Sequence, residues 1–262
     1  MKKKIARFVC AFCLMFLMAA HAHAEHKGGI VLVLSGGAMR GLAHIGVLQA
    51  LEEKGIPIVG IVGTSMGSII GGLAASGHSP EEILEVVETL DLGNLMSEQA
   101  TPIFVPSGDS DARLNQIPWA YMNKKGNVTG PPGGLTGVKL LEKLPQLASR
   151  VQIVHFDDLP IPFAAVATDL ETGKKVVLRS GSLASAMRAS MSIPILFEPW
   201  SIGGKLLVDG GLVSNLPVFT AKEIFPGYPV VAVDVTSSPR SKEQLRSILD
   251  VIDQTTTIFT AS

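Results

Sequence analysis

The sequence has few cysteines, and both stand near its N-terminus. Cys10 and Cys13 are the two thiols among 262 residues. If the N-terminal segment is removed, as its pattern predicts, the remaining chain can form no disulfide, and cysteine usage does not reveal a redox compartment. Long hydrophobic runs are also missing. The longest, Phe8 to Ala20, is shorter than the ~20 residues that a membrane-spanning helix needs.

The first 24 residues have the pattern of a secretory leader. Four basic residues lie within positions 2–7, the apolar run follows, and Ala-His-Ala at 22–24 supplies the small residues of a cleavage site. We expect cleavage after Ala24 and an exported protein, periplasmic or secreted. A retained N-terminal anchor is the alternative, and the sequence after Ala24 contains no stop-transfer pattern to support it.

The chain has no excess of positive charge. Without the leader, 18 Lys and Arg stand against 23 Asp and Glu, which gives a formal charge of −5. A nucleic-acid-binding protein would need a basic patch, so we expect no nucleic-acid partner. We also expect no metal ion and no cofactor. The remaining length, rich in aliphatic residues and glycine, suits a single α/β domain.

Apolar runs bounded by turn residues alternate with helical patterns. Continuous Val, Ile and Leu runs are typical of strands covered on both faces, so the pattern predicts a three-layer α/β/α fold with a mostly parallel central sheet. The expected strands are Ile30–Leu34, Ile58–Val62, Phe163–Thr168, Lys175–Leu178, Lys205–Val208 and Pro229–Val235. The expected helices are Leu42–Lys54, Met66–Ser76, Pro80–Thr89, Gly137–Ala148, Leu183–Ser190 and Lys242–Ile258.

The alternation defines a core at about residues 30–235, interrupted by residues 92–135. Pro, Gly, Asn and Ser are frequent in this insertion, yet Phe104 and Trp119 add apolar groups. Such insertions often serve as lids or binding loops, and a surface loop without a substrate role is an equal alternative. The last expected helix has no Gly or Pro terminator, which leaves open whether further chain follows Ser262.

A G-x-S-x-G motif, Gly63-Thr64-Ser65-Met66-Gly67, comes directly after the second expected strand and before a helix. This context is typical of a nucleophile elbow. The glycines permit the tight turn that presents the serine, and the helix N-terminus offers N–H groups to an anion. A Gly-rich turn with a capping serine is the alternative, and the position between strand and helix disfavours it.

A second Gly-rich turn, residues 35–41, joins the first expected strand to the next helix. Its backbone N–H groups can form a concave site for a phosphate or an oxyanion. A dinucleotide loop would require an acidic residue about 20 residues further on. This chain has the G-x-S-x-G motif there instead, so we favour an oxyanion hole. A third turn, Asp209-Gly210-Gly211, follows the strand at 205–208 and can point a carboxylate into the crevice above the sheet.

These three motifs, in this order, resemble those of the patatin-like phospholipase family. The segments Ala164–Gly173 and Met187–Pro199 are also similar to the family, so the resemblance covers roughly residues 30–235. It implies a lipid acyl hydrolase domain over residues 25–262, a fold distantly related to cytosolic phospholipase A2, and a phospholipid or other acyl-ester lipid as substrate. Transient contact with a membrane surface would accompany such a substrate.

The resemblance also implies a Ser-Asp dyad that works through an acyl-enzyme without a histidine. Ser65 would be the nucleophile and Asp209 its proton acceptor. The oxyanion hole is assigned to the backbone of Gly36, Gly37, Ala38 and Met66, with Ala38 standing where the family most often has a third glycine. The residues expected to support the motifs are Arg40, Gly41, Gly63, Gly67, Gly210 and Gly211. Arg40 either offsets a lipid phosphate or steadies the loop, and Ser190 and Ser192 are expected to shape the wall of the site.

The histidines agree with a two-residue mechanism. A catalytic serine usually passes its proton to histidine. In the order of α/β-hydrolases that histidine lies downstream of the serine, where this chain has only His78 and His155. A carboxylate that acts directly is the simpler explanation, and His44 is expected to pack or cap. A histidine-dependent hydrolase, an acyltransferase with the same dyad and an inactive lipid-binding module stay open as alternatives.

Overall fold

The computed structural model describes residues 28–89, 155–236 and 238–245, three short strands between positions 121 and 135, and helical residues 251, 254, 255, 257 and 258. The expected leader, the expected helix at 137–148 and most of the insertion at 92–135 lie outside these residues. The expected helix at 242–258 begins as a 3-10 turn, η4 (Lys242–Gln244), and much of its remainder also lies outside the description.

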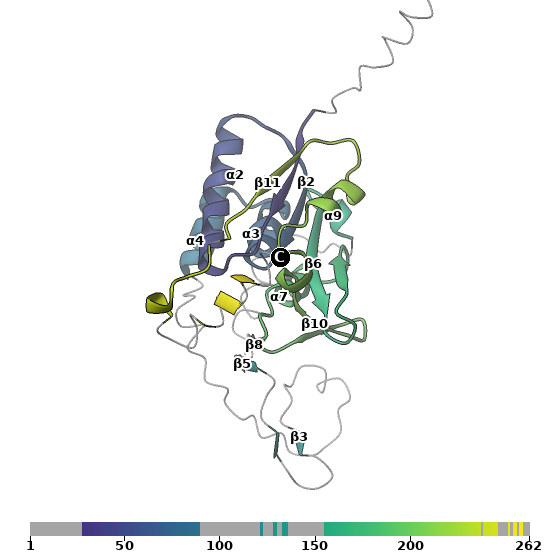
Figure 1. Ribbon diagram of the computed structural model, residues 1–262. Coiled ribbons are helices and arrows are strands. Elements are labelled where there is room, and N and C mark those ends of the chain that lie inside the picture. Colours follow the sequence, from purple (N-terminus) through teal and green to yellow (C-terminus); the bar gives the residue numbers. More distant parts are fainter. Residues whose placement is uncertain are drawn as a thin grey trace, which may run out of the picture.

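A seven-stranded sheet forms the centre of the molecule, in the order β11-β1-β2-β6-β10-β9, with β7 paired to β6 (Figure 1). Its strands are β1 (Ile30–Leu34), β2 (Ile58–Thr64), β6 (Phe163–Asp169), β7 (Lys175–Leu178), β9 (Trp200–Ile202), β10 (Lys205–Asp209) and β11 (Val230–Val233). The first four strands in the order pair in parallel, whereas β7, β10 and β9 pair antiparallel. The expected sheet is confirmed. Short hairpins join β6 to β7 and β9 to β10, whereas β10 reaches β6 after a long connection.

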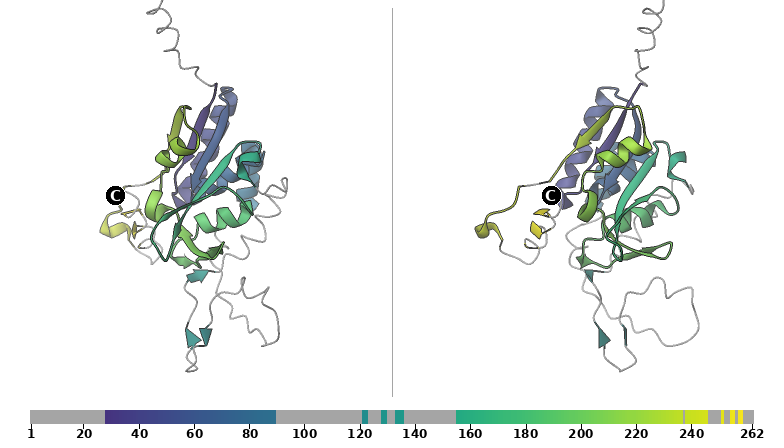
Figure 2. Two further views of the ribbon diagram at one scale, coloured as in Figure 1. Left: turned by 90° about the vertical axis from the view of Figure 1, so that its right-hand side faces the viewer. Right: turned by 45° about the vertical axis from the view of Figure 1, so that its right-hand side comes forward.

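Helices cover both faces of this sheet (Figures 1 and 2). The helices of the larger layer are α2 (Ala43–Glu53), α3 (Met66–Ala75), α4 (Pro80–Thr89) and α7 (Leu183–Ser190), and α9 (Val218–Ile224) covers the other face. Strand side chains alternate between the two layers: Leu32 and Leu34 join the larger core, whereas Val31 and Val33 pack with Ala221 of α9. The three-layer α/β/α fold is therefore confirmed.

The sequence patterns missed several short elements. These are η1 (Ala38–Leu42), η3 (Phe156–Asp158), α8 (Gly211–Ser214), α9, β8 (Ile195–Phe197), β9, β3 (Tyr121–Met122), β4 (Val128–Thr129) and β5 (Gly133–Leu135). All but α9 have five residues or fewer, too few to display a period. One of them connects distant parts of the chain, because β5 pairs in parallel with β8.

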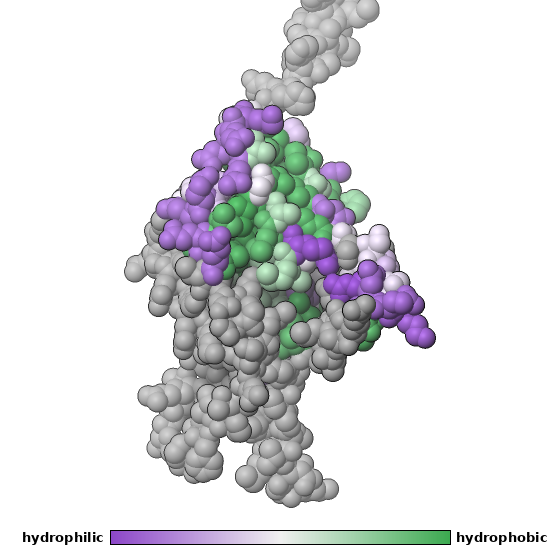
Figure 3. All heavy atoms as spheres, turned by 90° about the vertical axis from the view of Figure 1, so that its left-hand side faces the viewer, coloured by the Kyte–Doolittle hydropathy of each residue, from purple (hydrophilic) through white to green (hydrophobic). Residues whose placement is uncertain are grey.

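Part of the outer surface of the protein is hydrophobic. Figure 3 shows hydrophobic side chains gathered between hydrophilic ones on the face that lies to the left in Figure 1. β11 is the last strand of the sheet in the described region, and Val231 on it is 38% exposed. Within the same region, no helix is both long enough and apolar enough to cross a bilayer.

Candidate active site

The register of the sheet brings the three motifs together. Thr64, the last residue of β2, pairs with Val166 of β6. β6 continues beyond this point to Asp169, and β10 runs back along that extension until Asp209 pairs with Ala167. β2 and β10 therefore end one residue apart along β6, which brings Ser65, the residue after β2, close to Asp209, 144 positions further along the chain. β1 ends beside β2, with Leu34 opposite Gly63, which places the Gly-rich turn at the same edge.

Ser65 has a strained backbone. It stands between β2 and α3 with φ 54° and ψ −124°, and its exposed fraction is 6%. Among the described residues other than glycine, Ala38, with φ 47°, is the one other position with positive φ. Such conformations cost on the order of 1–3 kcal/mol and cluster at functional sites. Ser65 and Ala38, the two residues with this strain in the described part of the chain, thus lie in the two motifs predicted to hold the nucleophile and the oxyanion.

The glycines of these motifs permit close approach of backbone segments. Gly63, Gly67 and Gly210 all lack positive φ, so they allow the tight turn through the absence of a side chain and not through a left-handed conformation. A Cβ at Gly63 would lie 2.4 Å from the carbonyl oxygen of Gly67, and one at Gly67 would lie 2.4 Å from that of Leu34. A Cβ at Gly210 would lie 2.1 Å from the carbonyl oxygen of Val166. Any side chain at these positions would push the elements apart.

The Gly-rich turn lies against the nucleophile. A Cβ at Gly36 would be 3.0 Å from the Cβ of Ser65. The N–H of Gly36 itself donates to the carbonyl of Asn215 at 3.3 Å, so it supports the loop instead of adding the expected oxyanion donor. By contrast, the N–H groups of Gly37, Ala38 and Met66 have no partner in the described part of the chain. These three can bind an anion beside Ser65.

Two side chains brace this turn from outside. The Nε–H of Arg40 donates to the carbonyl of Val235 at 3.2 Å, which supports the loop-steadying role. His44 is fully buried, and its Nε2 lies 2.9 Å from the carbonyl oxygen of Ser35. Burial lowers the pKa of His44, so the neutral ring donates this bond. Its packing role is as expected. Gly41 permits contact with α3, because a Cβ there would lie 2.3 Å from Cγ of Met66.

Asp209 is buried beside Ser65, with an exposed fraction of 3%. Its Oδ1 accepts a hydrogen bond of 2.7 Å from the N–H of Gly211. Its Oδ2 is also buried but has no hydrogen bond of good geometry to any described group. Burial raises the pKa of Asp209 to about 6, and the Ser65 side chain and the Gly211 N–H both oppose this rise. The hydroxyl is therefore near the carboxylate without a fully aligned hydrogen bond, as is common before substrate binds.

The turn after α7 contacts the segments that carry Ser65 and Asp209. Ser190 and Ser192 were expected only to shape the wall of the site. The N–H of Ser65 donates to Oγ of Ser190 at 2.9 Å, and the N–H of Asp209 donates to the carbonyl of Ser192 at 2.9 Å. Thr168 adds a bond of 2.8 Å from its Oγ1 to the carbonyl of Asp209. Sequence reasoning missed these contacts, and the resemblance of the 187–199 segment was the one available signal.

The two histidines downstream of Ser65 lie away from Ser65 and Asp209. His78 follows α3, ten residues and therefore about 15 Å along a helix that starts at Ser65. Its Nδ1 is 3.1 Å from Oγ of Ser76 and 3.2 Å from the carbonyl of Leu73. His155 is exposed and precedes β6, at the opposite edge of the sheet. Among the described residues, no three His, Cys, Asp or Glu side chains are grouped to hold a metal ion.

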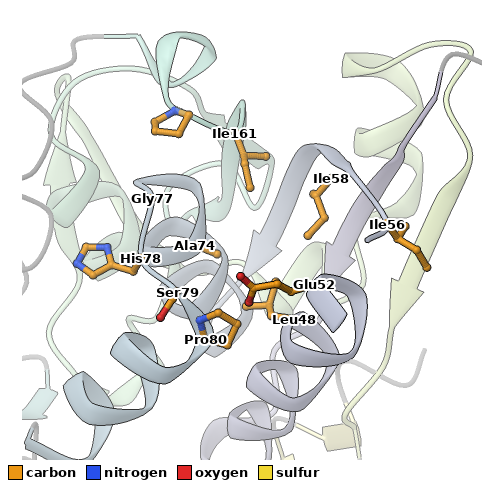
Figure 4. A pocket seen from close by; sticks show the side chains of 11 residues that line it. Leu48, Glu52, Ile56, Ile58, Ala74, Gly77, His78, Ser79, Pro80 and Ile161 are labelled. Carbon is orange, nitrogen blue, oxygen red and sulfur yellow. The ribbon is translucent and has the colours of Figure 1, made fainter. Parts of the chain in front are cut away.

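A cavity of about 400 Å³ lies at that opposite edge (Figure 4). Ile58, at the start of β2, lines it together with Leu48, Glu52 and residues around His78. Since Ser65 follows the other end of β2, this cavity is separated from Ser65 by the length of the strand. It does not provide the substrate site for Ser65.

Comparisons with known proteins identify similar chains. A family model described as patatin-like phospholipase matches residues 32–222. The chain is 35% identical over 189 residues to an uncharacterized NTE family protein, Mb1092c, of Mycobacterium bovis, which covers 72% of this chain and 44% of that protein. It is 32% identical over 216 residues to Lysophospholipase NTE1 of Mycosarcoma maydis, covering 81% of this chain and 10% of that protein. The chain thus spans less than half the length of these relatives. The crystal structure of VipD from Legionella pneumophila aligns over 74% of this chain and 47% of that one, at 21% identity and a TM-score of 0.44.

Proposed function

Because the chain belongs to the patatin-like phospholipase family, we propose that it hydrolyses acyl esters of lipids with Ser65 as the nucleophile and Asp209 as the general base. The observation that supports this most is the placement of the Ser65 side chain beside a buried carboxylate whose Oδ2 has no aligned partner. Asp209 can therefore accept a proton from Ser65 directly, with no histidine between them.

In the first step, the Oγ of Ser65 attacks the ester carbonyl carbon while its proton passes to Asp209. The carbonyl oxygen becomes an oxyanion, and the N–H groups of Gly37, Ala38 and Met66 stabilise it. The intermediate then collapses and the C–O bond to the leaving alcohol breaks. That alcohol takes the proton from Asp209, which leaves an acyl-enzyme on Ser65 and a charged carboxylate.

In the second step, a water molecule takes the place of Ser65 as the nucleophile and attacks the acyl-enzyme. Asp209 accepts a proton from the water, whose oxygen attacks the acyl carbon, and the same N–H groups bind the second oxyanion. Collapse breaks the bond to Ser65 Oγ, which recovers the proton from Asp209. The products are a free carboxylic acid and the original enzyme.

The pKa of Asp209 suits this work. A carboxyl group with a pKa of about 6 is a stronger base than an ordinary aspartate, yet it is still mostly ionised at neutral pH. The same burial that raises this pKa leaves Oδ2 without contact with bulk solvent. The structure thus supports general-base catalysis by Asp209.

We further propose phospholipids or lysophospholipids as the substrate class. The name of the Mycosarcoma maydis relative supports this, as does the description of the family model. The leader pattern at residues 1–24 supports export, so that a lipid of the envelope or of the medium would be within reach. N-terminal sequencing of protein from cell fractions tests export: an exported chain begins at Glu25, and an intact Met1 chain in the cytosol would contradict it.

The direct test is a panel of phospholipids, lysophospholipids and neutral acyl esters, with released fatty acid measured by mass spectrometry. Ser65→Ala and Asp209→Ala should each abolish release, and the double variant should be no worse, because residues that act as a unit are not additive. Added glycerol separates hydrolysis from acyl transfer, since a transferase would yield acyl-glycerol. Retained activity in Asp209→Ala would rule out the dyad.

A further inference from the structure

One short turn connects the two catalytic residues. The N–H of Asp209 donates a hydrogen bond to the carbonyl of Ser192, and the N–H of Gly210 donates to the carbonyl of Ser190 at 3.3 Å. The N–H of Ser65 donates to Oγ of Ser190 at 2.9 Å. Residues 190–192 therefore hold a backbone N–H from each of the two catalytic segments.

Ser190 has a special place in this turn because its hydroxyl is used twice. It accepts from the N–H of Ser65, and it donates to the carbonyl of Val166 at 2.6 Å. The residue has no exposed surface, so water cannot substitute for the hydroxyl. The carbonyl of Val166 is also the group against which Gly210 packs, which joins the elbow, β6 and the Asp209 turn in one continuous contact.

Ser65 needs such a restraint. Its φ of 54° and ψ of −124° lie outside the favoured regions for a residue with a Cβ, and conformations of this kind persist only where neighbours enforce them. Its N–H precedes the first turn of α3 and has no acceptor within that helix. Relaxation of φ toward negative values would turn this N–H away from Ser190 and move the side chain relative to Asp209.

We propose that Ser190 is a positioning residue that fixes the backbone of Ser65 and so places the nucleophilic hydroxyl beside the Asp209 carboxylate. Ser190 is buried and its hydroxyl bonds to the backbone of Ser65 and of Val166, so it acts on the reaction through Ser65. Its effect on turnover rests on the function proposed above, whereas its effect on the carboxylate does not.

The test is Ser190→Ala, which leaves the Ser65 N–H and the Val166 carbonyl buried without the hydroxyl. We expect kcat for a p-nitrophenyl acyl ester to fall about 10- to 100-fold, because a displacement near 1 Å costs that much, while KM changes less than threefold. The pKa of Asp209, followed by NMR of its side-chain carboxyl, should rise above about 6, because the Ser65 hydroxyl is one of the groups that lower it.

Ser76→Ala is the matched control. Ser76 is also a buried serine at the end of a helix, 3% exposed, and its Oγ donates to the carbonyl of Leu73 at 2.8 Å. Its loss should lower the melting temperature to a similar degree but leave kcat and the Asp209 pKa unchanged. Ser190→Cys fills nearly the same space with a weaker hydrogen-bonding group, should give an intermediate loss of kcat, and carries the same tests if Ser190→Ala does not fold.

A purely structural role would give a different result. If Ser190→Ala and Ser76→Ala have equal kcat, or if the Asp209 pKa is the same in wild type and Ser190→Ala, the positioning role is wrong. The proposed function fails separately, by absence of Ser65-dependent hydrolysis in the wild type. In that case the NMR titration still decides whether Ser190 sets the distance between Ser65 and Asp209.

Discussion

The N–H of Gly211 donates to Oδ1 of Asp209 at 2.7 Å, and so the carboxylate is held at one oxygen by its own turn. The other oxygen, Oδ2, is buried without an aligned partner among the described groups. This asymmetry leaves Oδ2 as the oxygen that is available to accept a proton. It also makes the charged form costly, because a single backbone donor does not replace the water that burial removes.

The first prediction concerns the pH dependence of activity. Asp209 must be ionised to accept a proton, and burial raises its pKa to about 6. We therefore expect kcat/KM to be constant above pH 7 and to fall tenfold per unit well below pH 6. Initial rates with a soluble acyl ester between pH 4.5 and 8 measure this. A profile that stays flat to pH 5 would mean that another group is the base.

The second prediction separates stability from activity at the same residue. Because the folded-state pKa of Asp209 lies above the ordinary value of 3.8, its effect on stability is most favourable below pH 3.8 and is lost as pH rises through about 6. Asp209→Asn removes the charge that causes this loss of stability, but its side-chain oxygen can still accept the hydrogen bond from the N–H of Gly211. We expect an inactive variant that is more stable by about 2–3 kcal/mol at pH 8, a difference that disappears near pH 3.5.

Urea unfolding at the two pH values measures this difference. Asp158→Asn, which alters an exposed carboxylate in η3, is the control and should change the free energy of unfolding little at either pH. If Asp209→Asn is less stable than the wild type at pH 8, the buried carboxylate is better stabilised than its surroundings indicate.

The third prediction compares two arginines. Arg188 has no exposed surface, donates from Nη1 to Oγ of Ser192, and lies 5.2 Å from the ring centre of Phe197 and 5.5 Å from that of Trp200. Arg188→Ala should cost at least about 3 kcal/mol of unfolding free energy, since it empties a buried site and removes its charge-assisted bonds. It should also lower kcat, because Ser192 holds the N–H of Asp209.

Arg179 supplies the contrast. It forms an ion pair of 2.6 Å with Asp157, but the two side chains are 40% and 51% exposed. Arg179→Ala should cost less than about 1 kcal/mol, because exposed pairs contribute little. Chemical unfolding of both variants gives the comparison, and equal losses would contradict the assignment of Arg188 to the support of the site.

The fourth prediction concerns Ala38. Its φ of 47° is unfavourable for a residue with a Cβ, so Ala38→Gly should raise the free energy of unfolding by about 1 kcal/mol. Ala43 lies a few residues later, exposed, with a helical φ of −61°. Ala43→Gly should instead destabilise by roughly 0.5–1 kcal/mol. Thermal unfolding of the pair checks the opposite signs, and a loss of stability in both would show that Ala38 is not strained.

The six strands expected from the sequence were all found, most within two residues of their observed bounds, because each depends on a local run of apolar residues between turn residues. The three motifs were also placed correctly at strand ends. The direction in which the strands pair was harder to predict from the sequence. The antiparallel course of β10 along β6 depends on register between distant segments, and it is this register that brings Asp209 to Ser65.

Parts of the site depend on contacts that no local pattern records. Gly36 stands in the motif with Gly37, yet its N–H is occupied by Asn215, 179 positions away. Ser190 is one of many serines in the sequence. Although the 187–199 segment resembles the family, no local pattern indicates that the Ser190 hydroxyl accepts a hydrogen bond from the N–H of Ser65. Such pairings follow from the packing of α7 under β6, which sequence periodicity does not specify.

The glycines at 63, 67 and 210 have one more consequence. Since none of them has positive φ, their contribution is the side chain they do not have, and each one brings two stretches of main chain almost into contact. The distances between Ser65, the Gly-rich turn and Asp209 are therefore set by direct contact between backbone segments, which cannot move closer together. A site built in this way should tolerate changes in the surrounding side chains better than the addition of a single methyl group at Gly63, Gly67 or Gly210.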